Sequence, residues 1–157
     1  MLFKRFFIAL SLFACFNAKA QLFTTGSLGI GYASDLFQVE AVPGVGYEIN
    51  DKWAVGLSLG VSTIGKDIFG VIDPYVRYTF FNKGAFSFDV KGKAGGYFSS
   101  VSIISFGAAP SIRYEIDQKW QIAADFGLIG IQMVDEKILP AFLLTSGNVQ
   151  MSAIYRF

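Results

Sequence analysis

Long stretches of this chain alternate apolar and polar residues with a period of two. The clearest run lies between Trp53 and Val61, where every second residue is large and apolar and the residues between are alanine, glycine or serine. A period of two puts successive side chains on opposite faces of a β-strand, whereas an amphipathic helix repeats every ~3.6 residues. The alternation therefore predicts an all-β fold from residue 21 onward.

Eight segments show this alternation. They cover residues 22–33, 36–49, 53–64, 70–81, 85–98, 103–116, 120–134 and 143–157. Strands of globular proteins are usually ~5–6 residues long, whereas strands that cross a bilayer need about 9–11. The lengths favour an eight-stranded antiparallel up-and-down transmembrane β-barrel, one domain over residues 21–157, above a soluble β-sandwich.

The connections between the segments are of two kinds. Tight turns rich in Asn, Asp and Gly lie at residues 50–52, 82–84 and 117–119. The other joins are mostly longer and lie near residues 33–35, 65–69, 99–102 and 135–142. Outer-membrane barrels have short periplasmic turns and longer outer loops. We therefore expect both the N-terminus and the C-terminus on the periplasmic side, as an even number of strands requires.

Three hairpins also share a proline. Pro43, Pro74 and Pro110 each precede a tyrosine by four residues. Because proline has no N–H to donate to a ladder, we expect these prolines at β-bulges.

The first 20 residues are typical of a secretory signal peptide that is removed. Lys4 and Arg5 form a basic start, residues 6–16 are apolar, and residues 18–20 read Ala-Lys-Ala, a cleavage site before Gln21. A membrane anchor is the alternative, but the apolar stretch is shorter than the ~20 residues of a transmembrane helix. Cys15, the only cysteine, lies in this leader, and acylation of Cys15 in place of cleavage stays open.

Composition argues against several classes of function. The chain has no histidine, the commonest general base and metal ligand, and it has no cysteine once the leader is removed. We therefore expect no cofactor, no metal and no catalytic residues. Without Lys4, Arg5 and Lys19, 10 basic residues face 12 acidic ones, a balance that does not predict nucleic-acid binding.

One face of the predicted strands gathers aromatic residues beside the tight turns. Tyrosine and tryptophan favour membrane–water interfaces because their rings are apolar and their tips polar. The core of a soluble sandwich would be equally apolar but would not concentrate such residues at one end. We expect a periplasmic aromatic girdle of Tyr47, Trp53, Tyr78, Phe86, Tyr114, Trp120 and Tyr155.

The opposite face carries acids and bases in nearly equal number. They are Glu40, Glu48, Asp73, Arg77, Asp89, Lys91, Lys93, Arg113, Glu115, Asp125 and Arg156. The interior of an eight-stranded barrel is just wide enough for side chains, and a buried charge needs a partner. We expect a lumen filled by a salt-bridge network, with Tyr75 and Tyr97 also pointing inward. A narrow polar conduit or ligand site predicts the same residues and is the competing interpretation.

The leader, the eight alternating segments, the tight turns and residues 152–157 together resemble the small OmpA/OmpX-type outer-membrane β-barrel family, in the short single-domain style of the Bacteroidetes group. The resemblance covers residues 21–157 as a pattern, without a catalytic motif. It implies a bacterial outer-membrane location with lipid around the barrel. It also implies insertion by the barrel-assembly machinery through a last strand ending in an aromatic residue, a signal that Tyr155 and Phe157 match.

The sequence leaves the biological task open. The leading hypothesis is a non-enzymatic, monomeric barrel with a structural or surface-interaction role. An outer-membrane enzyme is less favoured because the histidine-dependent chemistry of known barrel enzymes cannot be assembled here. Two further hypotheses are solute transport through the lumen and binding through apolar loops. Those loops are expected to contain Ile68, Phe69, Ile103, Ile138, Leu139 and Phe142.

Overall fold

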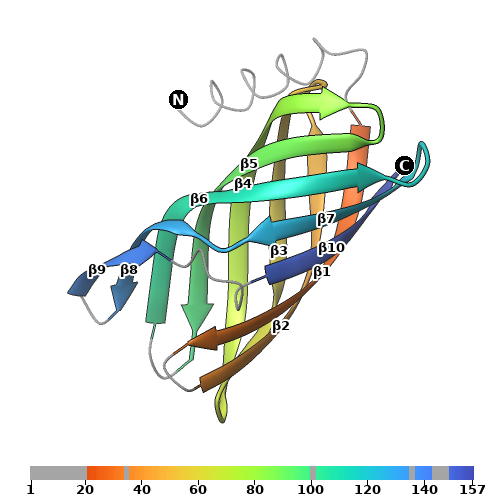
Figure 1. Cartoon of the computed structure of the whole chain (residues 1–157). Helices are drawn as coiled ribbons and strands as arrows, with labels where there is room; N and C mark the ends of the chain where they lie inside the picture. Colours follow the sequence, from red (N-terminus) through yellow and green to blue (C-terminus); the bar gives the residue numbers. More distant parts are fainter. Residues whose placement is uncertain (1–20, 34–35, 100–101, 135–136, 143–148) are drawn as a thin grey trace, which may run out of the picture.

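The computed structural model describes residues 21–33, 36–99, 102–134, 137–142 and 149–157 (Figure 1). Its strands are β1 (Gln21–Ala33), β2 (Leu36–Glu48), β3 (Trp53–Ile64), β4 (Asp67–Lys83), β5 (Phe86–Phe98), β6 (Ser102–Glu115), β7 (Trp120–Phe126), β8 (Ile129–Val134), β9 (Lys137–Phe142) and β10 (Val149–Arg156). Within these ranges no helix is long and apolar enough to cross a membrane. The predicted leader, with Cys15, and the predicted strand start at residues 143–148 lie outside the described residues.

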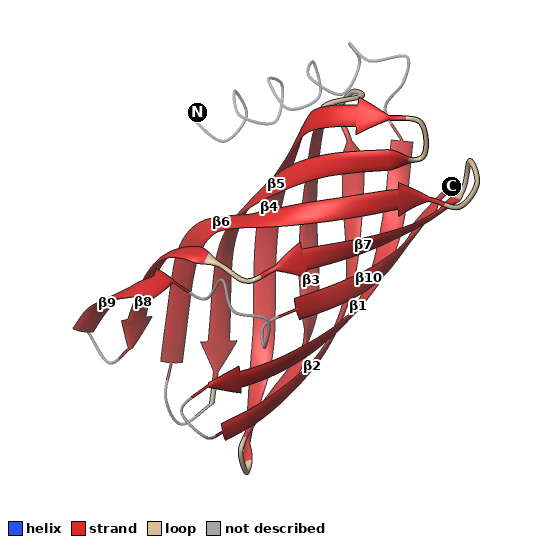
Figure 2. Ribbon diagram, in the orientation of Figure 1, coloured by secondary structure: helices blue, strands red, loops and turns tan. Residues whose placement is uncertain are grey.

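The strands form one closed antiparallel barrel of eight strands in up-and-down order, which confirms the predicted fold class. Each strand from β1 to β6 pairs with the next along the chain, and β10 closes the barrel by pairing with both β1 and β7. Figure 2 shows the resulting cylinder of strands. Both ends of the described chain meet beside the tight turns, where the Gln21 side chain donates a 2.7 Å hydrogen bond to the carbonyl oxygen of Phe157.

The seventh strand of the barrel is broken in two, which the sequence did not predict. Residues 120–134 were expected to be continuous, but β7 ends at Phe126 and β8 begins at Ile129. β7 pairs with β10, whereas β8 pairs with β9, which occupies residues expected to form a loop. The eighth strand is therefore β9 followed by β10. In Figure 1 the β8–β9 hairpin stands away from β10 and β1.

A change of register accompanies this break. Ser111 pairs with Asp125 and Ala108 pairs with Ile129. An advance of three residues along β6 therefore corresponds to four residues on the facing segment. Gly127 absorbs the extra residue with a φ of 67°, a conformation that costs glycine little. Pro110 lies opposite and has no N–H to donate there. The bulge expected at a proline is found at this position.

Pro43 and Pro74 do not lie at bulges, so that prediction was wrong for them. The β2–β3 and β4–β5 ladders lose pairs beside these prolines but keep the same register on both sides. The proline nitrogen leaves a gap in the hydrogen bonding without adding a residue. The bulge in β4 lies between Thr79 and Phe81 and turns both Phe80 and Phe81 outward.

Two of the tight turns are built alike. The side-chain oxygen of Asn50 accepts 2.9 Å hydrogen bonds from the backbone N–H groups of Lys52 and Trp53. Asp117 does the same for the two corresponding residues of its turn, at 2.7 Å. Asn and Asp side chains stabilise turns in this way. The repeated Tyr-Glu-Ile-Asx sequence before each turn therefore encodes the same hairpin twice.

The join expected at residues 65–69 is shorter than predicted. β4 begins at Asp67 directly after a two-residue turn, in which Gly65 has a φ of 61°. The residues expected in apolar loops lie in strands instead: Ile68, Phe69, Ile103, Ile138, Leu139 and Phe142. The hypothesis of binding through apolar loops was based on these residues lying in loops, so it loses its basis.

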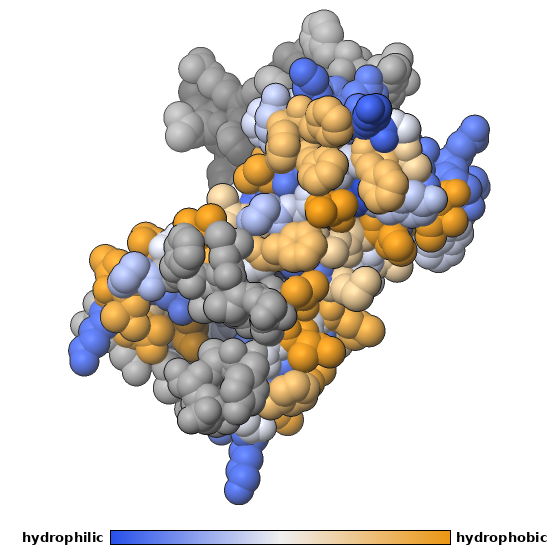
Figure 3. All heavy atoms as spheres, in the orientation of Figure 1, coloured by the Kyte–Doolittle hydropathy of each residue, from blue (hydrophilic) through white to orange (hydrophobic). Residues whose placement is uncertain are grey.

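The barrel wall is apolar outside and polar inside. On β3, Leu57 and Leu59 are 41% and 51% exposed, whereas Ser58 between them is 7% exposed. Figure 3 shows hydrophobic side chains over the visible outer wall, with hydrophilic residues gathered at the ends. Soluble monomers rarely expose a continuous apolar surface larger than a few hundred Å². This distribution is the reverse of that in a soluble domain.

Candidate functional site in the lumen

Every charged side chain predicted for the lumen forms an ion pair or a hydrogen bond there, and together they divide into two clusters. The turn-end cluster, beside the tight turns, consists of Glu48, Arg77, Asp89, Arg113, Glu115 and Arg156. The loop-end cluster, toward the other end, consists of Glu40, Asp73, Lys91, Lys93 and Asp125. Among the described residues no ion pair joins the two clusters.

Arg113 is the most highly connected residue of the turn-end cluster. Its guanidinium donates to Asp89 at 3.0 Å, to the Thr79 hydroxyl at 3.2 Å and to the Gln121 side-chain oxygen at 3.0 Å. Asp89 is 1% exposed and also accepts a 2.6 Å hydrogen bond from Thr79. Both partners of this ion pair are thus removed from solvent with several of their hydrogen-bonding groups satisfied, the condition under which a buried pair is tolerated.

Glu48 connects the remaining arginines of the turn-end cluster. It accepts hydrogen bonds from Arg77 at 2.7 Å and from Arg156 at 2.9 Å. Arg156 also reaches Glu115 at 3.4 Å. Three arginines therefore face three acids, so the formal charges of this cluster balance.

An apolar layer adjoins both clusters, which also meet directly where Arg77 and Lys91 are register partners on β4 and β5. It consists of Phe23, Ala54, Tyr75, Ala123 and Ile154, all 9% exposed or less. The rings of Phe23 and Tyr75 lie against glycines of adjacent strands, where a β-carbon would collide with them. The Arg77 guanidinium lies 5.4 Å from the Phe23 ring centre and the Lys91 ammonium 5.7 Å from that of Tyr75, distances typical of cation–π contacts.

Little open space remains beside this layer. The cavity remaining between Tyr75, Ile154 and the polar side chains around them measures about 20 Å³. A site needs roughly 10–15 Å³ to hold one water molecule. This cavity therefore has room for little more than a single water.

The loop-end cluster depends on lysine rather than arginine. Lys91 donates to both carboxylate oxygens of Asp125, at 2.8 and 2.9 Å. Lys93 lies between Asp125, at 3.3 Å, and Asp73, at 3.5 Å, and also donates to Gln150 at 3.0 Å. Three acids thus face two bases, and the formal charge of this cluster is one unit negative.

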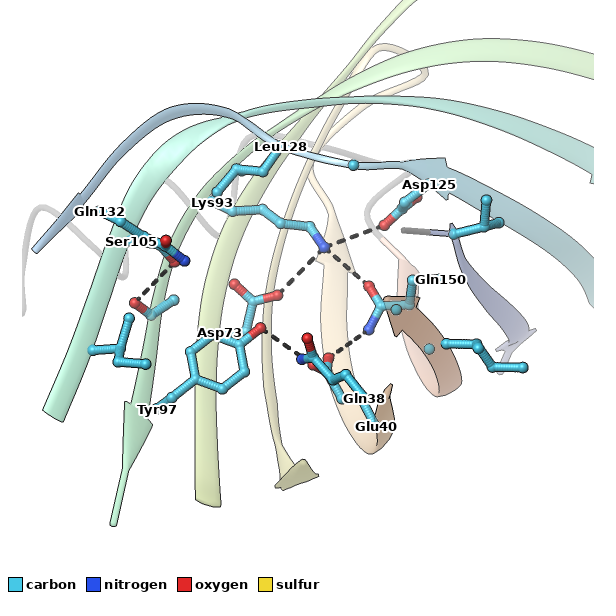
Figure 4. Close-up of a pocket in the computed structure, with 17 residues that line it drawn as sticks. Gln38, Glu40, Asp73, Lys93, Tyr97, Ser105, Asp125, Leu128, Gln132 and Gln150 are labelled. Carbon is cyan, nitrogen blue, oxygen red and sulfur yellow. Dashed lines mark hydrogen bonds and ion pairs between the residues drawn. The ribbon is translucent and has the colours of Figure 1, made fainter. Parts of the chain in front are cut away.

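A pocket of about 170 Å³ opens beside the loop-end cluster (Figure 4). Its polar lining includes Glu40, Asp73, Lys93 and Gln150. Glu40 accepts hydrogen bonds from the Tyr97 hydroxyl at 3.2 Å and from Gln150 at 3.0 Å. Figure 4 shows these side chains converging on one space from different sides of the barrel. A second hollow, of about 400 Å³, lies at the mouth beside the tight turns.

The residues predicted for the girdle lie on the outer wall at the turn end. Three cross-strand ring pairs have centroids 4.7 to 4.9 Å apart: Trp53–Tyr78, Phe86–Tyr114 and Trp120–Tyr155. Tyr47 lies on β2 between its register partners Leu22 and Val55. The Phe157 ring packs edge-on against Tyr155 at 5.3 Å.

Several lumen residues carry no charge and were not singled out from the sequence. Thr79 and Gln121 complete the turn-end cluster, Gln150 completes the loop-end cluster, and Phe23 fills the apolar layer. Strand parity was the signal that could have found them, because each lies in the inward file of its strand. What parity does not tell is which inward residues contact one another across the lumen.

Neither the known protein-family models nor the curated proteins compared with this chain match its sequence.

Proposed function

We propose that this protein is a non-enzymatic barrel integral to a bacterial outer membrane, with a structural or surface-interaction role and a lumen closed by its own side chains. The observation that carries the proposal is the apolar outer wall around a polar, ion-paired interior. In a bilayer every backbone polar group needs a partner, and a closed barrel satisfies this requirement without free edges. The ring pairs at the turn end would lie at the periplasmic interface.

The proposal includes an orientation and an assembly route. The tight turns and both chain ends would face the periplasm, and the β8–β9 hairpin would face outward. Tyr155 and Phe157, whose rings contact each other on the outer wall, would be recognised by the barrel-assembly machinery. The folded barrel would be a monomer surrounded by lipid.

Fractionation of bacterial membranes tests the location. The protein should be recovered with the outer membrane and should migrate differently on gels before and after boiling, because a folded barrel resists unfolding by detergent. Recovery in the soluble periplasm with no change in mobility would contradict the proposal.

A narrow solute channel is the second candidate, favoured by the hollows at both ends of the lumen. The buried layer that includes Phe23, Tyr75 and Ile154, with only a 20 Å³ cavity beside it, argues against conduction. Single-channel recordings in planar bilayers should therefore show no steady open level. A stable conductance from the unmodified protein would support the channel over the closed barrel.

A further inference from the structure

The pocket at the loop end lies where the wall of the barrel is interrupted. Pairing of β7 with β10 ends at Phe126 and Val149, and β8 then follows β6 away from β10. The pocket is lined on both sides of this interruption, by Gly127 and Leu128 from the break and by Val149 and Gln150 from β10. The break thus contributes Leu128 to the apolar part of the pocket lining.

The carboxylates of the loop-end cluster outnumber its lysines by one. Both lysines of the loop-end cluster are already engaged with Asp125, and Lys93 is further shared with Asp73. Glu40 accepts hydrogen bonds only from neutral groups among the described residues, those of Tyr97 and Gln150. Lys93 attracts Glu40 but forms no ion pair with it, and a buried carboxylate with no cation in direct contact is costly, since its charge is removed from water with little compensation.

A second observation shows where a donor is missing. The Oδ1 atom of Asp73 is buried and has no hydrogen-bond partner in the described part of the chain. Buried polar atoms in proteins nearly always have one, so an orphan calls for an explanation such as an absent ligand or ion. Figure 4 shows Asp73 beside Glu40 on the same side of the pocket, with Lys93 above them.

We propose that this pocket binds a small organic monocation, a primary ammonium group on a short apolar body. The ammonium would donate hydrogen bonds to Glu40 and to Asp73 Oδ1 and supply the missing charge. The apolar body would contact Leu128, Ile103 and the ring of Tyr97, which also line the pocket. An anion would be repelled by the excess of carboxylates. Among the described residues no acidic side chains are grouped closely enough to hold a metal ion.

The volume of the pocket sets the size of the ligand. A cavity of roughly 150 Å³ holds a benzene molecule, so 170 Å³ accommodates benzylamine. Benzyl alcohol and benzoate have nearly the same shape with a neutral and a negative head. These three probes therefore separate charge from shape.

Isothermal titration of the purified barrel in detergent micelles is the test. Benzylamine should bind about tenfold or more tightly than benzyl alcohol, and benzoate should not bind, because charge-assisted hydrogen bonds form only with the ammonium. Glu40→Gln and Asp73→Asn should each weaken benzylamine binding by about tenfold. Glu115→Gln, the same kind of change at the opposite end of the barrel, is the matched control and should leave binding unchanged.

Two results would overturn the proposal. One is equal affinity of the wild-type protein for benzylamine and benzyl alcohol, a comparison that needs no variant to fold. The other is benzylamine binding that survives both Glu40→Gln and Asp73→Asn. Gel mobility before and after boiling reports folding separately, so a folded barrel that does not discriminate the probes counts against this inference and leaves the membrane proposal untouched.

Discussion

The two charged clusters of the lumen share a barrel but are built by different rules. The turn-end cluster pairs three arginines with three acids, and the planar guanidinium of Arg113 makes hydrogen bonds in several directions at once. The loop-end cluster uses two lysines for three acids and leaves a buried oxygen of Asp73 without a donor. Arginine suits buried, multiply bonded ion pairs, whereas lysine is a compact point charge.

The contrast indicates a division of roles. The turn-end network is balanced in charge, so we expect it to close and stiffen the barrel, although the buried Nε atoms of Arg77 and Arg156 also have no hydrogen-bond partner among the described residues. An unbalanced network beside a cavity keeps unused binding capacity, so recognition belongs to the loop end. If this is correct, equivalent substitutions at the two ends should have different consequences.

The largest effect is expected from Arg113→Met. Removing the guanidinium leaves Asp89 buried without its cation, which should lower the free energy of unfolding by about 3–5 kcal/mol. Urea titration followed by the fluorescence of Trp53 and Trp120 would measure the loss. The exposed turn variant Lys52→Met is the control. A loss no larger than that of the control would show that the turn-end cluster does not stabilise the barrel.

Phe23→Ala tests the apolar layer that adjoins both clusters. Phe23 is fully buried, and truncating such a ring typically costs about 3–4 kcal/mol. The variant should also empty side-chain volume from the lumen, so brief channel openings should appear in planar bilayers. Unchanged stability would mean that the layer does not pack as described.

A smaller loss is expected from Glu48→Gln. The amide retains one acceptor but removes the charge that holds Arg77 and Arg156, so the free energy of unfolding should fall by about 1.5–3 kcal/mol. The same urea titration measures it. An unchanged free energy of unfolding would remove the distinction between a charge-balanced and an unbalanced cluster.

Glu40→Gln is the matched substitution at the loop end, and its effect should be the smallest and of opposite sign. It removes a buried carboxylate that Lys93 attracts without forming an ion pair, so stability should be unchanged or should rise by about 1 kcal/mol or less. The measurement is again the urea midpoint, at equal slope. A loss as large as that of Glu48→Gln would show that both ends obey the same rule and would break the comparison.

Most of the architecture could be read from local sequence. The period of two, the segment lengths and the Asn and Asp turns predicted the closed eight-stranded barrel and the bounds of most strands. The inward files of β2, β4 and β5 followed from parity alone, because a strand can only present alternate residues to one side.

The errors fall where one strand depends on its neighbour. Nothing in residues 120–134 breaks the alternation strongly enough to predict the split at Gly127. The split arises because Pro110 on β6 cannot bond there and the facing chain gains a residue. Likewise, Phe80 and Phe81 both face outward only because β5 sets the register beyond Thr79.

The sequence by itself determined that this chain forms a barrel with an apolar outside and a charged inside, since alternation is a local property of each strand. Only the tertiary structure decided how the inner charges divide, because strand register brings together residues far apart in the chain. Lys93 and Gln150, or Arg156 and Glu48, meet only when the barrel closes. Closure therefore decides which charges are satisfied and where one remains to be paired.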